Sequence, residues 1–156
     1  MPLVFGAPRQ MHALPAADMH QSMLASRSIL VCDDEAPIRH VIAHRLRTGG
    51  FTVREARTGL EGLKAITGPE AFRPQLIITD YQMPEMSGIE MAALLRKFDA
   101  TASTPVLMLT ARGYTLTPDE LATTNIRHII SKPFGVRLLL DRVQELLDAP
   151  PPRLAA

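Results

Sequence analysis

The sequence lacks several features that would set its class. It has a single cysteine among 156 residues, which excludes an internal disulfide and a CxxC metal motif and fits a reducing cytoplasm. It has no apolar run of about 18 residues, so we expect no membrane span. No lysine- or arginine-rich segment followed by an apolar stretch stands at the N-terminus, so we expect no signal peptide. With 17 basic and 16 acidic side chains the net charge is +1, which gives no reason to expect nucleic-acid binding.

The chain divides into one ordered domain and two tails. Residues 1–26 contain scattered proline, glycine and alanine without any period, so we expect a disordered extension, with Met19 or Met23 as a possible true start. Residues 27–148 carry all of the periodic pattern. Three consecutive prolines from Pro150 stop the last helix, and residues 149–156 are predicted to form a Pro-rich tail. We expect no DNA-binding or catalytic output domain.

Within the domain, short apolar runs alternate with helical patterns. The predicted strands are 28–32, 51–55, 76–79, 106–110 and 127–131. Apolar residues at helical spacing occupy the windows 38–46, 60–66, 89–95 and 136–147, and 117–125 is predicted to be a short helix. Strands of nearly continuous Ile, Val, Leu and Met are expected to be buried on both faces. This alternation predicts an α/β fold, a doubly wound five-stranded parallel sheet with helices on both faces.

Five polar or charged residues stand at the predicted carboxyl ends of the strands. They are Asp33, Asp34, Asp80, Thr110 and Lys132. In open α/β sheets, ligands bind outside the carboxyl ends of the strands, at a topological switch point. We therefore expect these side chains to converge on one edge of the sheet and to form the functional site.

Three carboxylates in one crevice require a counter-charge. Two unit charges about 5 Å apart repel by roughly 3 kcal/mol at an effective dielectric constant of about 20. Mg²⁺ relieves this repulsion, because it combines a few carboxylates with waters and phosphate oxygens. Lys132 adds a positive charge for a phosphate, and Thr110 adds a hydroxyl donor. The set predicts a phosphoryl-transfer site in which an aspartate becomes the covalent acceptor.

Four short motifs occur in order at these strand ends. They are Asp33-Asp34, the segment from Asp80 to Gly88, Thr110-Ala111 and Lys132-Pro133-Phe134. Together they resemble the receiver domain of bacterial response regulators, in a single-domain arrangement like that of chemotaxis regulators, over about residues 27–148. The resemblance implies a flavodoxin-like sheet with strand order 2-1-3-4-5. It also implies a signalling switch, not an enzyme, that assists its own phosphorylation and dephosphorylation.

The same resemblance assigns roles to the residues at the site. Asp80 would be the phosphoacceptor, and Asp34 would bind Mg²⁺ directly, with Asp33 acting through water. The backbone carbonyl of Gln82 would complete the protein ligands. Lys132 would contact the phosphoryl oxygens, and Thr110 would move to form a hydrogen bond with the new phosphate.

Further residues would shape the pocket or tune it. Ala111 leaves the pocket open, Met83, Pro84 and Gly88 would shape the loop after Asp80, and the bond before Pro133 is expected to be cis. Gln82 and Arg112 occupy positions that tune dephosphorylation in the family. We expect the long cationic side chain of Arg112 to shield the phosphoryl group or to pair with Glu35 or Glu85.

One position departs from the family pattern. Activated receivers usually couple the threonine to an aromatic side chain on strand five, three residues before the lysine. Here that position is Ile129, and the neighbouring His128 is expected to point to the opposite face of the strand. The output is therefore expected to use another rearrangement.

Two surfaces are predicted to bind partners. The first helix carries basic residues on its polar side, namely Arg39, His40, His44, Arg45 and Arg47. We expect a solvated basic face that docks a sensor histidine kinase or a histidine phosphotransfer protein; His40 and His44 are also spaced as a metal pair, but no third ligand is evident. The segment 117–125, strand five and the last helix are expected to bind a target protein or a second copy of the chain as a homodimer.

Two other functions are compatible with parts of the pattern. A phosphohydrolase with an aspartate nucleophile and Mg²⁺ would favour an Asp-x-Asp loop, but Gln82 stands two residues after Asp80. A non-phosphorylated adaptor would not need the intact set of Asp80, Thr110 and Lys132. A phosphorylation switch, binding a target or relaying the phosphate, is the better interpretation.

Overall fold

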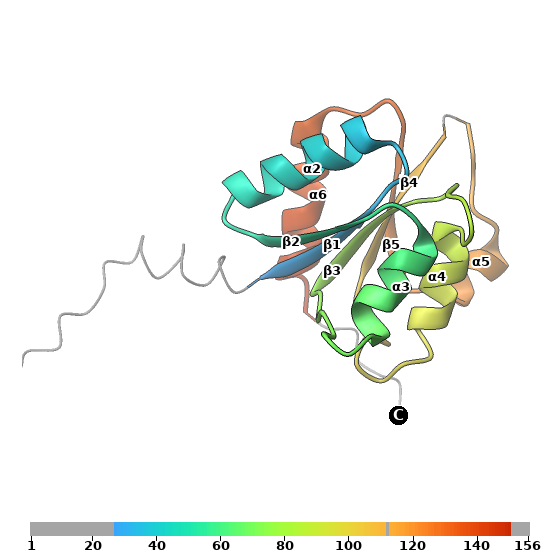
Figure 1. Cartoon of the computed structure of the whole chain (residues 1–156). Helices are drawn as coiled ribbons and strands as arrows, with labels where there is room; N and C mark the ends of the chain where they lie inside the picture. The colour runs from blue at the N-terminus through green and yellow to red at the C-terminus, as the bar shows by residue number, and fades with distance from the viewer. Residues whose placement is uncertain (1–26, 112, 151–156) are drawn as a thin grey trace, which may run out of the picture.

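The computed structural model describes residues 27–111 and 113–150, in which five strands alternate with five helices (Figure 1). The elements are β1 (Ser28–Cys32), α2 (Ala36–Thr48), β2 (Thr52–Ala56), α3 (Gly59–Thr67), β3 (Leu76–Asp80), α4 (Gly88–Leu95), β4 (Val106–Thr110), α5 (Pro118–Ala122), β5 (Ile126–Ser131) and α6 (Val136–Asp148). The predicted extension 1–26, Arg112 and residues 151–156 of the predicted tail lie outside the described residues. Within the described residues, no helix combines the length and apolarity that crossing a membrane requires.

The strands form one parallel sheet with the order β2-β1-β3-β4-β5. Helices α2 and α6 cover one face, and α3, α4 and α5 lie on the other (Figure 1). The first strand, β1, lies in the interior of the sheet, with β2 on one side of it and β3, β4 and β5 on the other. The strand order therefore reverses between β1 and β3. Both the predicted fold class and the predicted strand order are confirmed.

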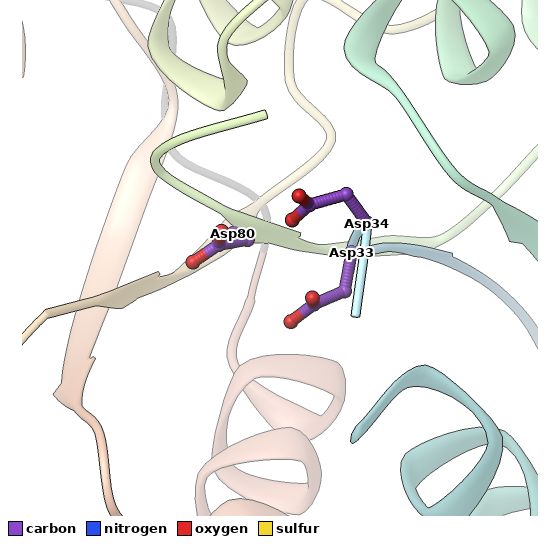
Figure 2. A group of neighbouring side chains, drawn as sticks. All are labelled: Asp33, Asp34 and Asp80. Carbon is purple, nitrogen blue, oxygen red and sulfur yellow. The ribbon is translucent and has the colours of Figure 1, made fainter. Parts of the chain in front are cut away.

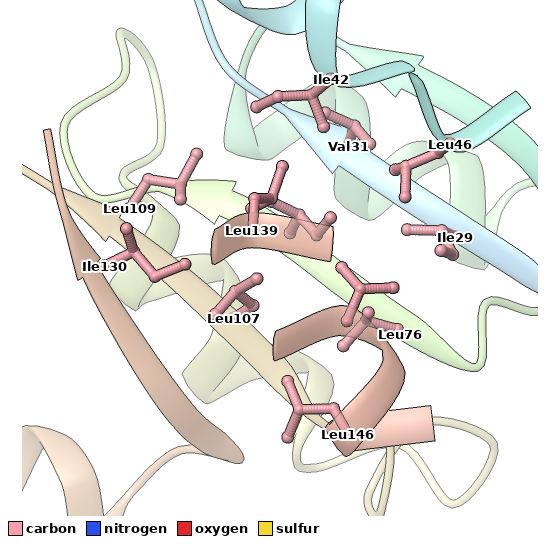
Figure 3. Packing of buried hydrophobic residues seen from close by; sticks show 12 residues of the cluster. Ile29, Val31, Ile42, Leu46, Leu76, Leu107, Leu109, Ile130, Leu139 and Leu146 are labelled. Atoms are coloured by element: carbon pink, nitrogen blue, oxygen red, sulfur yellow. The ribbon is translucent and has the colours of Figure 1, made fainter. Parts of the chain in front are cut away.

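The sheet is enclosed by two apolar layers. One packs β-strand residues such as Ile29, Ile78 and Leu107 against Leu46 and Leu139 of the helices α2 and α6 (Figure 3). The other joins the opposite face of the sheet to α3 and α4. Every residue of β3 and β4 is buried, because both of their faces are covered. This rigid central sheet fixes the positions of the residues at its carboxyl edge.

Local signals set most of the helix boundaries. The side chain of Thr58 accepts a hydrogen bond from the amide of Glu61, and Ser87 forms a capping box with Glu90, as their positions before the helices predict. The first helix ends at Gly49. The structure corrects the expected strands by one residue in places, since β2 is shifted to 52–56 and β3 includes Asp80. The predicted short helix within 117–125 is regular only over Pro118–Ala122.

Candidate functional site

The predicted acidic residues meet at the carboxyl edge of the sheet. Asp33 and Asp34 directly follow β1, and Asp80 is the last residue of the neighbouring β3. Each offers a carboxylate oxygen, and these three oxygens lie within 4.8 Å of one another (Figure 2). Asp33 and Asp80 are buried, whereas Asp34 is exposed. The convergence that parallel strands impose thus places three carboxylates in one small volume.

Lys132 brings a positive charge to these carboxylates. Its Nζ lies 3.0 Å from Oδ2 of Asp33, 3.2 Å from Oδ1 of Asp80 and 3.2 Å from Oε1 of Glu35. Glu35 is the N-cap residue of α2, but its side chain makes no cap hydrogen bond and instead accepts one from Lys132. The second oxygen of Asp33, Oδ1, accepts a hydrogen bond from the amide of Glu35 at 2.9 Å. Lys132 is therefore shared among three carboxylates.

The titration of these groups reflects their crowding. Burial raises the pKa of Asp80 to about 6, with Lys132 opposing the rise and Asp33 and Asp34 adding to it. Burial also raises the pKa of Asp33, against the hydrogen bonds from Glu35 and Lys132. Burial alone would lower the pKa of Lys132, but the Asp33 hydrogen bond and the negative charges of Asp33 and Asp80 raise it above its ordinary value. The net charge of the cluster is negative, and it disfavours ionisation of Asp80.

This imbalance predicts a stabilising effect of Asp80→Asn. Because the pKa of Asp80 rises from 3.8 to about 6 on folding, wild-type stability falls as the pH rises between these values. Without divalent cations, Asp80→Asn is expected to be more stable than wild type by about 1–2 kcal/mol at pH 7.5, after allowance for solvent screening, and equal to it below pH 4. Urea unfolding at both pH values measures this. The exposed Asp99→Asn is the control, and a difference that does not depend on pH would contradict the electrostatic cause.

Thr110 ends β4 beside the acidic cluster. Its Oγ1 is buried, and it has no hydrogen-bond partner among the described residues. An unsatisfied buried hydroxyl costs about 1–3 kcal/mol, which makes a ligand that accepts its hydrogen bond favourable. The exposed Ala111 follows and leaves the edge open, and a pocket of about 380 Å³ extends from Asp80 to Ala111, Gln82 and Lys132. Of the predicted residues, Asp34, Asp80, Gln82, Ala111 and Lys132 thus line one pocket, and Asp33 and Thr110 are buried.

The residues predicted to support the pocket lie between the end of β3 and the start of α4 and directly after Lys132. The amide of Gly88 donates to the carbonyl of Tyr81, which folds the loop after Asp80 back on itself. Met83 packs against the core and Pro84 is exposed. The peptide bond between Lys132 and Pro133 is cis, as expected. Arg112 lies outside the described residues.

The residues present suit a hard divalent cation. Oxygens on one octahedral Mg²⁺ lie about 3–4 Å apart, which the three carboxylates can reach with small movements. The side-chain atoms of the cluster that could bind a metal are all carboxylate oxygens. The thiol of Cys32 is not among them, because it is buried in the apolar core, where burial raises its pKa. Burial and the neighbouring carboxylates of Asp33 and Asp34 raise the pKa of Asp80, and a cation bound to these oxygens would oppose that rise. Asp33, Asp34 and Asp80 could therefore hold Mg²⁺.

Arg39 was missed as a site residue. It was assigned to the solvated basic face, but it is buried, because it shares the face of α2 that carries Ile42, Ala43 and Leu46 at helical spacing. Its Nη1 donates to the carbonyl of Asp33 at 2.7 Å, and its Nε to Glu55 at 3.3 Å.

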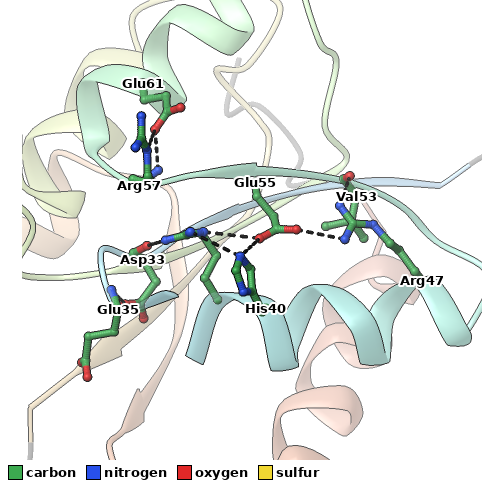
Figure 4. A network of polar contacts seen from close by, with 9 residues as sticks. Asp33, Glu35, His40, Arg47, Val53, Glu55, Arg57 and Glu61 are labelled. Carbon is green, nitrogen blue, oxygen red and sulfur yellow. Dashed lines mark hydrogen bonds and ion pairs between the residues drawn. The ribbon is translucent and has the colours of Figure 1, made fainter. Parts of the chain in front are cut away.

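Glu55 also interacts with two other basic side chains of α2. It accepts a hydrogen bond from Arg47 at 2.9 Å and lies 3.6 Å from Nε2 of His40 (Figure 4). The network ties the loop that carries the acidic pair to α2 and β2. His44 and Arg45 are exposed, as expected for the solvated face.

A second group was not foreseen at all. Tyr81 and Tyr114, the only tyrosines of the chain, lie in the loops that follow β3 and β4. Their ring centroids are 4.3 Å apart, and both hydroxyls lie near Oε1 of Glu120 on α5. The signal was available, since one tyrosine follows Asp80 directly and the other stands four residues after Thr110. Both tyrosines line the pocket that contains Asp80.

An apolar groove adjoins the pocket. It has a volume of about 630 Å³ and runs between α2 and the start of α6. Ile38 and Val41 line it on α2, and Pro133 and Phe134 line it on the other side. Ala111 and Lys132 line both the groove and the acidic pocket, so the two are continuous.

Comparisons with known proteins agree with the geometry. A family model described as the response regulator receiver domain matches residues 29–144. The chain is 34% identical over 124 residues to the phosphate regulon transcriptional regulatory protein PhoB of Pseudomonas aeruginosa, covering 80% of this chain and 53% of that protein. It is 30% identical over 120 residues to a chemotaxis protein CheY homolog of Campylobacter jejuni, covering 76% of this chain and 91% of that protein.

Solved structures show the same similarity. The chemotaxis response regulator CheY4 of Vibrio cholerae superimposes with a TM-score of 0.69 at 30% identity, covering 78% of this chain and 98% of that one. The chain spans about half the length of the first curated relatives that it matches.

Proposed function

The chain belongs to the response regulator receiver domain family, and on this premise we propose that it is a phosphorylation switch whose Asp80 accepts a phosphoryl group in the presence of Mg²⁺. One observation supports this above the others. Three carboxylate oxygens within 4.8 Å, a shared lysine and an unsatisfied threonine hydroxyl surround the end of β3. These groups are what a transferred phosphoryl group requires around its acceptor.

The ligands of the cation follow from how each carboxylate is engaged. Both oxygens of Asp33 already accept hydrogen bonds, from Lys132 and from the amide of Glu35, which favours an indirect role through water. Asp80 and the exposed Asp34 would bind Mg²⁺ directly, with the backbone carbonyl of Gln82 as a third ligand. When bound, Mg²⁺ would neutralise part of the negative charge on the phosphoryl oxygens.

The transfer itself uses the carboxylate of Asp80. A carboxylate oxygen forms a bond to phosphorus, the bond from phosphorus to the ring nitrogen of a donor phosphohistidine breaks, and the leaving imidazole keeps that electron pair and takes up a proton from solvent. Lys132 lies 3.2 Å from Asp80, and its ammonium group would contact the negatively charged oxygens of the transferred phosphoryl group. Thr110 would donate its unused hydroxyl hydrogen to the same group.

The donor is proposed to dock in the apolar groove between α2 and the start of α6. The groove reaches the acidic pocket at Ala111 and Lys132, so a helix seated there would bring a histidine side chain to Asp80. Val41 is 49% exposed, which leaves apolar surface available for such a contact. A sensor histidine kinase or a histidine phosphotransfer protein has the required chemistry.

Other aspects of the function stay predictions. Gln82 and Arg112 would tune the lifetime of the phosphorylated state. The output surface around α5, β5 and α6 would bind a target protein or a second copy of the chain, or the phosphate would be relayed onward. A stand-alone arrangement is also a prediction; the match covers 91% of the CheY homolog and 53% of PhoB. A cytoplasmic location is the expectation from the single cysteine.

A labelling experiment tests the proposed function. The protein is incubated with phosphoramidate and Mg²⁺, and its intact mass is measured over time. Wild type is expected to gain one acid-labile phosphoryl group, and Asp80→Ala none. The matched control is Asp99→Ala, an exposed aspartate outside the site, which should label as wild type does. Labelling of Asp80→Ala, or wild-type labelling that is unaffected by a chelator, would overturn the assignment.

A further inference from the structure

A phosphorylation switch must transmit the state of Asp80 to a surface, and the usual aromatic residue for this is missing. Ile129 stands at that position, and its side chain is 40% exposed. An aliphatic side chain has no polar group through which Thr110 could be sensed. His128 cannot substitute, because its ring lies on the other face of β5, 3.6 Å from Glu145 on α6. A different element has to connect the pocket to the surface.

Tyr81, Tyr114 and Glu120 form a continuous chain of hydroxyls between the pocket and α5. The Tyr114 hydroxyl donates to the Tyr81 hydroxyl at 2.5 Å, and the Tyr81 hydroxyl donates to Oε1 of Glu120 at 3.1 Å. The Tyr114 hydroxyl also lies 3.4 Å from the same Oε1 of Glu120, so both hydroxyls contact this carboxylate. The chain therefore crosses from the loop after β3 to the first turn of α5.

The two tyrosines are tied to the two residues that phosphorylation would change. Tyr81 follows Asp80 directly, and its amide donates to the carbonyl of Leu109, next to Thr110, at 2.8 Å. The amide of Tyr114 donates to the carbonyl of Ala111, on the other side of Thr110, at 3.1 Å. A movement of Thr110 toward a phosphoryl group on Asp80 would shift Ala111. Both tyrosines would then be displaced, because their amides are bonded to the residues on either side of Thr110.

Helix α5 is held in a way that permits it to move. It contains no buried residue, so core packing does not fix it. At its start, Glu120 accepts from the amide of Thr117 at 2.7 Å through its second oxygen, Oε2. At its end, Arg96 donates to the carbonyls of Ala122 and Thr124 at 2.9 and 2.8 Å. Segments attached by polar contacts at their ends open at low free energy.

We propose that the Tyr81–Tyr114–Glu120 chain transmits phosphorylation from Asp80 to α5, in place of the aromatic residue on β5. In the unphosphorylated protein the chain holds α5 against the loop after β3. Movement of Thr110 and Ala111 toward the phosphoryl group pulls Tyr114 with it. Because the rings of Tyr81 and Tyr114 pack together, the contacts of both hydroxyls with Glu120 weaken together, and the first turn of α5 is released. The exposed Leu121 of that helix would then be presented differently to a target. This inference rests on the proposed function, since it requires a phosphoryl group on Asp80.

Hydrogen exchange of the α5 amides tests it on the full chain. The activating probe is Mg²⁺ with beryllofluoride, a phosphoryl mimic whose binding is followed separately by fluorine NMR. In wild type, the probe is expected to accelerate exchange in α5 by about tenfold. In the double variant Tyr81→Phe/Tyr114→Phe, which keeps both rings but removes the two hydroxyls that contact Glu120, exchange should already be fast, and the probe should change it less than about twofold.

The control is Ile129→Ala, which alters the position of the usual aromatic and is expected to respond as wild type does. A tenfold response that persists in the double tyrosine variant, or one that Ile129→Ala abolishes, would overturn the chain as the route. If wild type binds beryllofluoride without any change in α5, this inference fails and the proposed function stands. If wild type neither binds the probe nor is labelled by phosphoramidate, the proposed function fails, and this inference fails with it.

Discussion

Replacing Lys132 by methionine is expected to destabilise the protein by about 2–4 kcal/mol at pH 7.5 in the absence of Mg²⁺. Lys132 lies 3.0 Å from Asp33 and 3.2 Å from Asp80, and its side chain is only 17% exposed while that of Asp33 is fully buried. Methionine fills a similar volume, so the loss comes from charge and not from a cavity. Three carboxylates would then face one another without their ammonium group.

The pH dependence identifies the cause. Asp80, with a pKa of about 6, is already largely protonated at pH 5, so the destabilisation of Lys132→Met should be markedly smaller there than at pH 7.5. Millimolar Mg²⁺ should restore part of the stability, because it supplies positive charge to the same oxygens. Labelling by phosphoramidate is expected to slow by about 100-fold even with Mg²⁺ present, since the charge on the phosphoryl oxygens loses one partner.

Urea unfolding at the two pH values, with and without Mg²⁺, measures these effects. The exposed Lys97→Met is the matched control and should change stability by less than about 0.5 kcal/mol. An equal loss for Lys132→Met at both pH values, insensitive to Mg²⁺, would mean that the lysine acts through packing and not through its charge.

The contrast between Lys132 and Arg39 shows what the sequence could predict. The position of Lys132 follows from topology: it is the first residue after β5, and parallel strands bring their carboxyl ends to one edge. The same reasoning located Asp33, Asp34, Asp80 and Thr110. Arg39 belongs to the opposite case. Its charge suggested solvent, but its helical position was buried, and its partner Glu55 lies 16 residues away on β2.

The contacts among Tyr81, Tyr114 and Glu120 could not be predicted from the periodicity of the sequence, for another reason. Tyr81 and Tyr114 lie in loops, whose conformations no repeating pattern specifies, and their rings meet although they are 33 residues apart. Glu120 also forms the capping box of α5 with Thr117. One of its oxygens caps the helix and the other accepts from the tyrosines, and only the folded arrangement of three separate segments reveals the second role.

Substituting Gly88 by alanine is expected to lower stability by about 2–4 kcal/mol and to weaken Mg²⁺ binding by about tenfold. A β-carbon at this position would lie 2.1 Å from the carbonyl oxygen of Asp80 and 2.8 Å from Oγ1 of Thr79. The nearest obstacle is backbone, which cannot rotate away as a side chain can. The start of α4 would therefore have to move away from β3, and the loop that carries Gln82 would move with it.

Gly135→Ala separates this steric effect from the general cost of losing a glycine. Gly135 precedes α6 with φ −79°, and a β-carbon there would meet no atom within 4 Å. Its substitution should change stability by less than about 0.5 kcal/mol and leave Mg²⁺ binding unaltered. Thermal unfolding and titration of Mg²⁺ distinguish the two variants. Equal behaviour of both would show that the loop after Asp80 yields readily, and the close contact between Gly88 and Asp80 would then not be what sets the geometry of the phosphoacceptor pocket.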